Sequence, residues 1–167
     1  SHIDPGKVFE LDAISETASS FGYDINVAVV GASGGIGSAI ADAVDASPHV
    51  SAVFRLARST APHSATGYNV HLDLEDEATI EAAAEAVAQA TAALHLIIVA
   101  TGTLHDGGDF QPEKSWTALS ATALDRAFRI NATGPALVAK HFLPLLVKNR
   151  KAGFAALSAR VGSIEDN

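Results

Sequence analysis

The chain contains neither cysteine nor methionine among its 167 residues. Without cysteine it can form no disulfide, no thiolate metal site and no cysteine nucleophile. Its seven histidines are scattered without the spacing of metal ligands, so we expect no metal site. These absences favour a cytoplasmic protein.

Positive charge and long apolar runs are also scarce. The chain has 11 Lys and Arg residues against 19 Asp and Glu residues, a formal net charge of −8. This balance argues against nucleic acid or an anionic membrane surface as a partner. No run reaches the roughly 18 apolar residues of a membrane span. Because 48% of the residues are nevertheless hydrophobic, the chain can build the core of one domain.

Apolar strand patterns alternate with helical patterns after residue 24. The expected strands lie at about 25–31, 50–57, 68–72, 94–100 and 154–157, and the expected helices at about 36–46, 75–93 and 123–147. Such alternation predicts an α/β, Rossmann-like fold with a doubly wound parallel sheet. Right-handed crossovers predict the strand order 3-2-1-4-5, with a ligand bound at the carboxyl ends where the order reverses. We assign residues 25–167 to this domain and residues 1–24 to an N-terminal arm or a tag-derived, irregular segment.

The most informative motif is the glycine-rich stretch GASGGIG at residues 31–37, between the first strand and the first helix. Glycines permit a tight turn and a close approach to a pyrophosphate, while the helix start presents free N–H groups. The pattern is G-x-x-x-G-x-G on Gly31, Gly35 and Gly37, which differs from G-x-G-x-x-G and lacks the lysine of a triphosphate-binding loop. The motif predicts a dinucleotide site, although such a turn can also be a plain connector.

Cofactor preference depends on the end of the second strand. No acidic residue lies between Asp45 and Asp73, where an NAD-specific site places a carboxylate for the ribose 2′-hydroxyl. The chain has Arg55 and Arg58 there instead, and a guanidinium can bind a 2′-phosphate in bidentate fashion. The sequence therefore predicts NADP(H) over NAD(H), with Arg58 as the contact, or otherwise a surface arginine at a strand end. The missing acid also argues against an adenosylmethionine-dependent methyltransferase.

Several segments together resemble the short-chain dehydrogenase/reductase (SDR) family. They are VVGASGGIG at 29–37, Asp73-Leu74 after the third strand, VATG at 99–102 and Asn131 in a long helix. The stretches RINATGPALVAKHFLPLL at 129–146 and FAALSARVGSI at 154–164 look closer still to the C-factor-like (cell–cell signalling) branch. The resemblance runs from about Asn26 to the end.

The resemblance implies roles for individual residues. Those it places around the cofactor are Gly31, Ser33, Gly34, Gly35, Ile36, Gly37, Asp73, Leu74, Ala100, Thr101 and Gly102. Asp73 would hydrogen-bond the adenine amine. Ala100 and Thr101 depart from the family's Asn-Asn-Ala-Gly segment, which weakens the stabilising role of that motif. Asn131 matches the catalytic asparagine that holds a water for the proton relay; alternatively, it bonds the backbone at a helix kink near Pro135.

The family's proton donor, the tyrosine of a Tyr-x-x-x-Lys pair, has no match. The only tyrosines are Tyr23 and Tyr68, and no lysine stands four residues after either. The serine that orients the carbonyl is ambiguous, because Ala159 occupies its usual position; we favour Ser158 over Ser163. The family places its pair shortly after this serine. We therefore expect a chain that stops before its proton donor and a fold truncated after strand five.

Two functions remain open. The first is an NADP(H)-dependent oxidoreductase for a small-molecule carbonyl or alcohol, present as its cofactor-binding portion. The second is a non-enzymatic nucleotide-binding signalling or interaction protein. The apolar 123–147 helix and an exposed last strand both need burial, which predicts a homo-oligomer formed through that helix.

Overall fold

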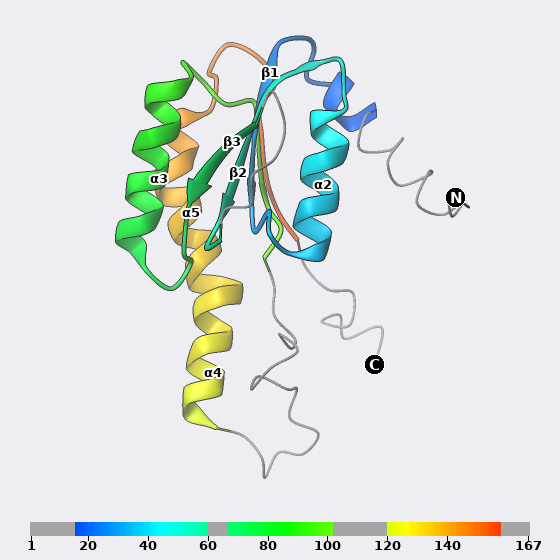
Figure 1. The fold of residues 1–167 in the computed structure, drawn as a ribbon. Helices are drawn as coiled ribbons and strands as arrows, with labels where there is room; N and C mark the ends of the chain where they lie inside the picture. The colour runs from blue at the N-terminus through cyan, green and yellow to red at the C-terminus, as the bar shows by residue number, and fades with distance from the viewer. Residues whose placement is uncertain (1–15, 60–66, 102–119, 158–167) are drawn as a thin grey trace, which may run out of the picture.

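The computed structural model describes residues 16–59, 67–101 and 120–157, which build one parallel sheet of five strands. The sheet order is β3-β2-β1-β4-β5, which confirms the predicted fold (Figure 1). The strands are β1 (Ile25–Val30), β2 (Val50–Ala57), β3 (Gly67–His71), β4 (Leu96–Val99) and β5 (Gly153–Ala156). The helices are α2 (Gly35–Asp45), α3 (Glu77–Ala90), α4 (Ala121–Phe128) and α5 (Gly134–Phe142), with a π-helix η2 (Arg129–Thr133) and a 3-10 turn η3 (Leu143–Leu145).

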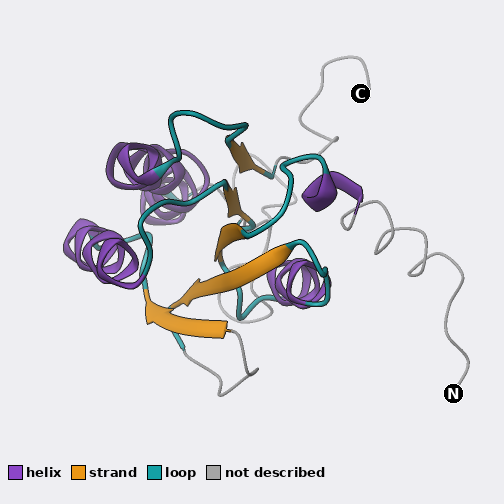
Figure 2. Cartoon of the chain, turned by 90° about the horizontal axis from the view of Figure 1, so that it is seen from above, coloured by secondary structure: helices purple, strands orange, loops and turns teal. Residues whose placement is uncertain are grey.

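Helices cover both faces of the sheet, so each central strand is buried twice. Helix α2 lies on one face, and α3 and α5 lie on the other (Figures 1 and 2). Along β1, Ala28 and Val30 join the core beneath α3 and α5, whereas Val27 and Val29 join the core beneath α2. A strand buried on both faces reads as a continuous apolar run, which is the pattern that made β1 recognisable.

The single helix expected over 123–147 is interrupted. Helix α4 passes into the π-helix η2 before α5 begins, and α5 ends in the 3-10 turn η3. Pro135 lies in the first turn of α5 and has no N–H, so the carbonyl of Asn131 cannot receive the usual helical bond. Pro144 lies at the start of η3. Figure 1 shows that α4 projects beyond the carboxyl ends of the strands.

A short helical turn at residues 16–19 packs against the α2 face of the sheet, within the segment assigned to an N-terminal arm. Phe21 is buried there, and Arg150 Nη2 donates to the carbonyls of Phe21 (3.2 Å) and Tyr23 (2.8 Å). Lys151 donates to Ser20 Oγ at 2.7 Å. These bonds join the start of β1 to the turn before β5.

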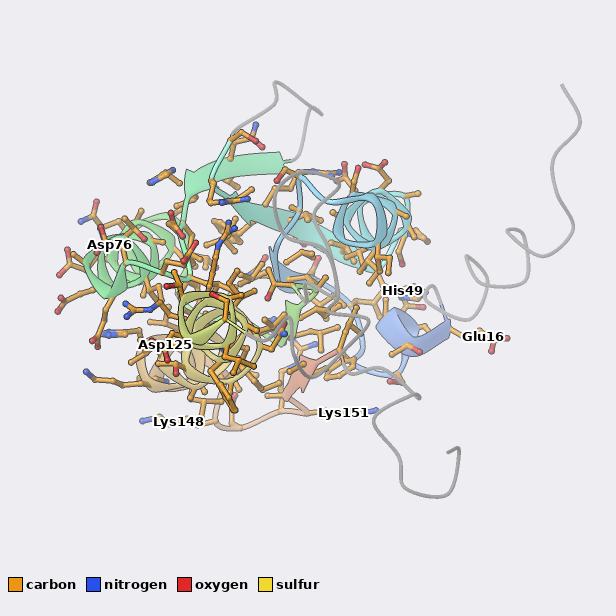
Figure 3. All side chains as sticks on the ribbon, turned by 90° about the horizontal axis from the view of Figure 1, so that it is seen from below. Glu16, His49, Asp76, Asp125, Lys148 and Lys151 are labelled. Atoms are coloured by element: carbon orange, nitrogen blue, oxygen red, sulfur yellow. The ribbon has the colours of Figure 1, made fainter. Side chains whose placement is uncertain are left out.

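Exposed charged side chains surround the layers. Figure 3 labels Asp76 at the start of α3, Asp125 on α4, and Lys148 and Lys151 before β5, and all four side chains are exposed. Within the three described stretches, no helix has the length and apolar character that crossing a membrane would require.

Candidate functional site

A cleft of about 210 Å³ lies at the carboxyl ends of the strands, where the order reverses between β1 and β4. Five segments converge on it, each leaving a strand end except the last, which belongs to η2. They contribute Val30, Gly31, Ser33 and Gly34; Ala57 and Arg58; Leu72, Asp73, Leu74 and Glu75; Ala100 and Thr101; and Ile130. Eight of the residues predicted from the sequence thus line one cleft, and they come from four separate strand ends.

Two glycines close the turn after β1. Gly31 has φ +86°, and a Cβ there would lie 2.6 Å from Thr101 Cγ2 and 3.0 Å from the Ala100 oxygen. A Cβ on Gly37 would overlap the carbonyl oxygen of Gly31 and lie 2.7 Å from its carbonyl carbon. The fold therefore requires glycine at 31 and 37.

Gly35 is different, because a Cβ there would meet no atom within 4 Å. The fold alone does not require glycine at this first residue of α2. The helix has no side-chain cap and no acidic residue in its first turn, so no side chain compensates its N-terminal amides or the positive end of its dipole. Ile36, in the same turn, is 66% exposed. This open, electropositive corner suits an anionic group that approaches the backbone closely.

The two arginines of the β2 region have separate surroundings. The Arg55 side chain is only 7% exposed, and it pairs with Asp42 Oδ1 at 2.9 Å and with Asp45 Oδ2 at 3.5 Å on α2. Arg55 therefore ties α2 to the sheet. Arg58 is exposed and lines the cleft. Of these two arginines, Arg58 is the one that can meet a ligand in the cleft.

The turn after β3 holds the acidic side of the cleft. The Oδ1 atom of Asp73 accepts from the Glu75 amide at 2.9 Å, and the Asp73 amide donates to Thr79 Oγ1 at 2.9 Å. Glu75 also pairs with Arg126 of α4 at 3.6 Å. Leu74 is buried in the core while it lines the cleft. Thr79 of α3 thus holds the backbone at Asp73, and Arg126 of α4 holds the side chain of Glu75.

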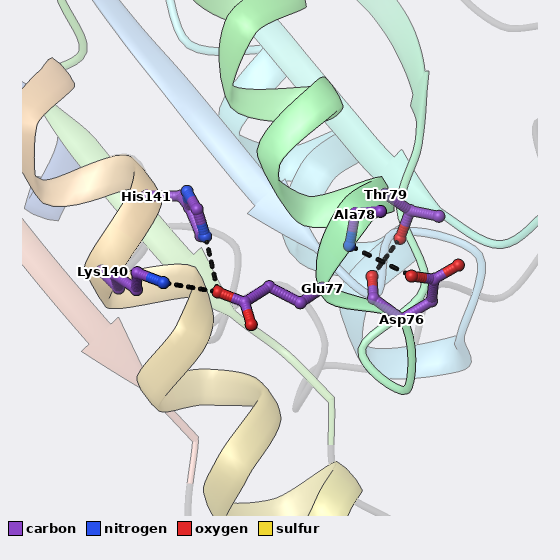
Figure 4. A network of polar contacts seen from close by, with 6 residues as sticks. All are labelled: Asp76, Glu77, Ala78, Thr79, Lys140 and His141. Atoms are coloured by element: carbon purple, nitrogen blue, oxygen red, sulfur yellow. Dashed lines mark hydrogen bonds and ion pairs between the residues drawn. The ribbon is translucent and has the colours of Figure 1, made fainter.

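A polar network joins α3 to α5 (Figure 4). Asp76 caps α3 by accepting from the Ala78 amide at 3.0 Å. Glu77 accepts from Lys140 Nζ at 2.6 Å and bonds His141 Nε2 at 3.0 Å. The hydrogen bond from Lys140, followed by that from His141, lowers the pKa of the Glu77 carboxyl, and Glu77 in turn raises the pKa of Lys140. The network holds the helical segment that follows Asn131.

Asn131 lies in the π-helix η2 and is exposed. Its neighbour Ile130 lines the cleft, whereas Asn131 is not among the lining residues. π-helical turns occur often at functional sites, and this one directly precedes the segment that contains Pro135. The two readings of Asn131, relay group and kink residue, remain compatible.

Three predicted residues, Gly102, Ser158 and Ser163, lie outside the described residues. The amide of Leu157 donates to the Val99 carbonyl at 2.9 Å, which brings the backbone just before Ser158 to the carboxyl end of β4. Sequence reasoning missed five lining residues: Val30, Ala57, Leu72, Glu75 and Ile130. The first four stand at strand ends beside predicted residues, so the rule that ligands bind at carboxyl ends could have found them.

A model of the short chain dehydrogenase family matches residues 26–163. The chain belongs to this family. Over 85 residues it is 36% identical to the short chain dehydrogenase tazN of Aspergillus terreus, a match that covers 49% of this chain and 17% of that protein.

Solved structures of the family share the fold. The NADPH-bound carbonyl reductase from chicken fatty liver superposes with a TM-score of 0.73 at 23% identity, covering 89% of this chain and 63% of that one. The ligand-free aldohexose dehydrogenase of Thermoplasma acidophilum gives 0.70 at 22% identity, covering 85% and 52%. The chain therefore spans between about half and two thirds of these two structures.

Proposed function

We propose that this chain is the cofactor-binding part of an NADP(H)-dependent short-chain dehydrogenase/reductase that acts on a carbonyl or alcohol. The carrying observation is the cleft itself, whose lining includes both the exposed Arg58 and Gly34, the residue at the uncapped start of α2. The next residue, Gly35, leaves an open position beside it. No acidic side chain stands at the end of β2 to repel a 2′-phosphate. The residues present thus fit an anionic dinucleotide.

The proposed roles follow from position. The amides after Gly34 would hold the pyrophosphate, Asp73 would accept from the adenine amine, and Arg58 would hold the 2′-phosphate. When bound, the cofactor supplies or accepts a hydride at its nicotinamide ring. Asn131 and Ser158 are proposed to hold a relay water and to orient the carbonyl. The NADPH seen in the chicken carbonyl reductase supports the cofactor class.

Neither tyrosine stands at the cleft as a proton donor. The ring of Tyr23 lies tilted against that of His49, with centroids 4.6 Å apart, near the amino end of β1. Tyr68 stacks on Phe54 at 4.7 Å, near the amino end of β3. General acid catalysis contributes about 10²- to 10⁴-fold to a rate. We therefore expect this chain to bind the cofactor weakly and to turn over substrate negligibly.

The test is a titration of NADPH and NADH followed by nicotinamide fluorescence, with Arg58→Gln as the variant. Loss of a charge-assisted contact should weaken NADPH binding roughly 10- to 100-fold and leave NADH nearly unchanged. Lys148→Gln is the matched control, because it removes the same charge from an exposed site before β5. A wild-type chain that binds neither cofactor would disprove the proposal.

A second candidate is a non-enzymatic nucleotide-binding signalling or interaction protein of the C-factor-like branch. The position of both tyrosines away from the cleft favours it. The encoding reading frame distinguishes the two: continuation into a Tyr-x-x-x-Lys segment supports the enzyme, and a stop codon after Asn167 supports the interaction protein.

We further propose a cytoplasmic homo-oligomer paired through the segment 123–147. Leu124, Phe128 and Leu143 along it are exposed by 40%, 67% and 46%. Large apolar side chains on one segment are typical of a surface that another subunit covers. Light scattering after size exclusion tests this pairing, and a clean monomer would contradict it.

A further inference from the structure

His71 is bonded to the residue that carries the proposed cofactor preference. Strands β2 and β3 pair in parallel up to Ala57 and His71, and the Leu72 amide donates to the Ala57 carbonyl at 3.0 Å. Arg58 lies one residue past the end of β2. Its carbonyl oxygen lies 3.0 Å from Nδ1 of His71. A carbonyl can only accept, so Nδ1 carries the hydrogen and the neutral ring is the Nδ1–H tautomer.

This bond continues the hydrogen bonding between β2 and β3 by one residue, to Arg58. The peptide group between Arg58 and Ser59 is planar, so a donor fixed on its carbonyl restrains the orientation of the entire plane. The Arg58 side chain leaves the backbone at this point and lines the cleft. Without the bond, the strand end would sample more conformations, and the guanidinium would be held less often where a ligand meets it.

His71 is not itself among the residues that line the cleft. It is exposed on the last pair of the β2–β3 ladder, and its ring reaches back to the backbone of Arg58. Any effect of His71 on a ligand at this site must therefore pass through Arg58, or through the backbone that leads from β3 to Asp73. These two routes have different consequences for the two nicotinamide cofactors.

We propose that His71 is a positioning residue that sets the preference for NADP(H) over NAD(H) by holding Arg58 in place. The inference rests on the proposed function. NADPH and NADH share the adenine that Asp73 would bind and differ only in the 2′-phosphate that Arg58 would hold. The ratio of their dissociation constants therefore isolates the route through Arg58.

The experiment compares His71→Ala with His71→Asn, whose side-chain amide can replace the Nδ1–H donor. Both cofactors are titrated into each variant by nicotinamide fluorescence, and thermal unfolding confirms that each is folded. We expect His71→Ala to weaken NADPH binding about 3- to 10-fold, the usual effect of one lost hydrogen bond, and to change NADH binding little. His71→Asn should recover most of the NADPH affinity that His71→Ala loses.

A double-mutant cycle with Arg58→Gln completes the test. If His71 acts through Arg58, His71→Ala leaves the ratio unchanged in the Arg58→Gln background. An equal loss of both cofactors, an unchanged ratio, or an effect that persists without Arg58 would each overturn the inference while the proposed function stands. If the wild type binds neither cofactor, the proposed function fails and the inference fails with it. The ¹⁵N shifts of the wild-type ring give a separate check at alkaline pH, where a predominant Nε2–H tautomer would contradict the bond.

Discussion

Gly35 and Gly37 should respond in opposite ways to the same added methyl group. The three atoms nearest to a Cβ at Gly37 all belong to backbone: the carbonyl oxygen and carbon of Gly31, and the Cα of Ala32 at 3.3 Å. Backbone atoms cannot rotate away as a side chain could, so the turn itself must move. At Gly35 the same Cβ meets nothing within 4 Å. Gly37→Ala and Gly35→Ala therefore form a matched pair within one helical turn.

The expected magnitudes follow from these contacts. Overpacking usually costs about 1–3 kcal/mol, and an immovable neighbour places Gly37→Ala near the upper end. For a chain of 167 residues, each kcal/mol lowers Tm by about 2–4 °C, so Gly37→Ala should unfold about 6–12 °C below the wild type. Gly35→Ala should keep Tm within about 2 °C or raise it slightly, because alanine favours the helix and restricts the unfolded chain.

The assay is thermal unfolding by circular dichroism without ligand, followed by NADPH titration of the folded variants. Gly35→Ala should lose at least about 10-fold in NADPH affinity, because its methyl group would occupy the open corner beside the first amides of α2. Wild-type affinity in Gly35→Ala would show that the pyrophosphate does not approach there. Wild-type stability in Gly37→Ala would refute the packing of the turn.

Two further predictions concern pH. Burial, followed by the charge of Arg150, lowers the pKa of His95 below its ordinary 6.5, so neutral His95 contributes stability in full above pH 6.5 and loses it as the pH falls through its lower folded pKa. His95→Asn, which keeps an acceptor but does not titrate, should flatten the decline of the urea midpoint between pH 7 and 5; an unchanged slope would exclude His95 as its source. The lowered pKa of Glu77 means that its bonds to Lys140 and His141 stabilise the fold above pH 4.5 and weaken as the pH falls below that value. Glu77→Gln should remove this loss of stability at acid pH and should reduce the salt dependence of stability at neutral pH. If the variant keeps both the acid loss and the salt dependence, the bonds of Glu77 do not contribute to stability.

The strand order was predictable because each strand is a short apolar run and each crossover is right-handed, which leaves few topologies. The sequence predicted Arg58 as the ligand contact, but it did not predict that Arg55 pairs with α2. This pairing depends on α2, which presents Asp42 and Asp45 three residues apart to the buried guanidinium of Arg55. The spacing of Asp42 and Asp45 indicates that both carboxylates lie on one face of α2. Only the packing of α2 on the sheet shows that they pair with Arg55.

The region around Asn131 was harder to predict. Pro135 predicts a break in the helix because it has no N–H. A helix can accommodate the missing bond by a kink, a water or a π-turn, and each of these orients the preceding residues differently. Ile130, which lines the cleft, belongs to the π-helical segment. The role of His71 has no sequence signature, because a ring that bonds the backbone of Arg58 across 13 residues leaves no periodic pattern.

The bonds from Arg150 and Lys151 to residues 20–23 have a practical use. They bring early and late parts of the chain together at the amino end of β1. Because β1 is six residues long and the cleft lies at its carboxyl end, this corner lies roughly 20 Å from the cleft. A fluorescent probe attached at the exposed Ser19 would therefore report loosening of that corner, and a surface tether placed there would leave the opposite end free for titration.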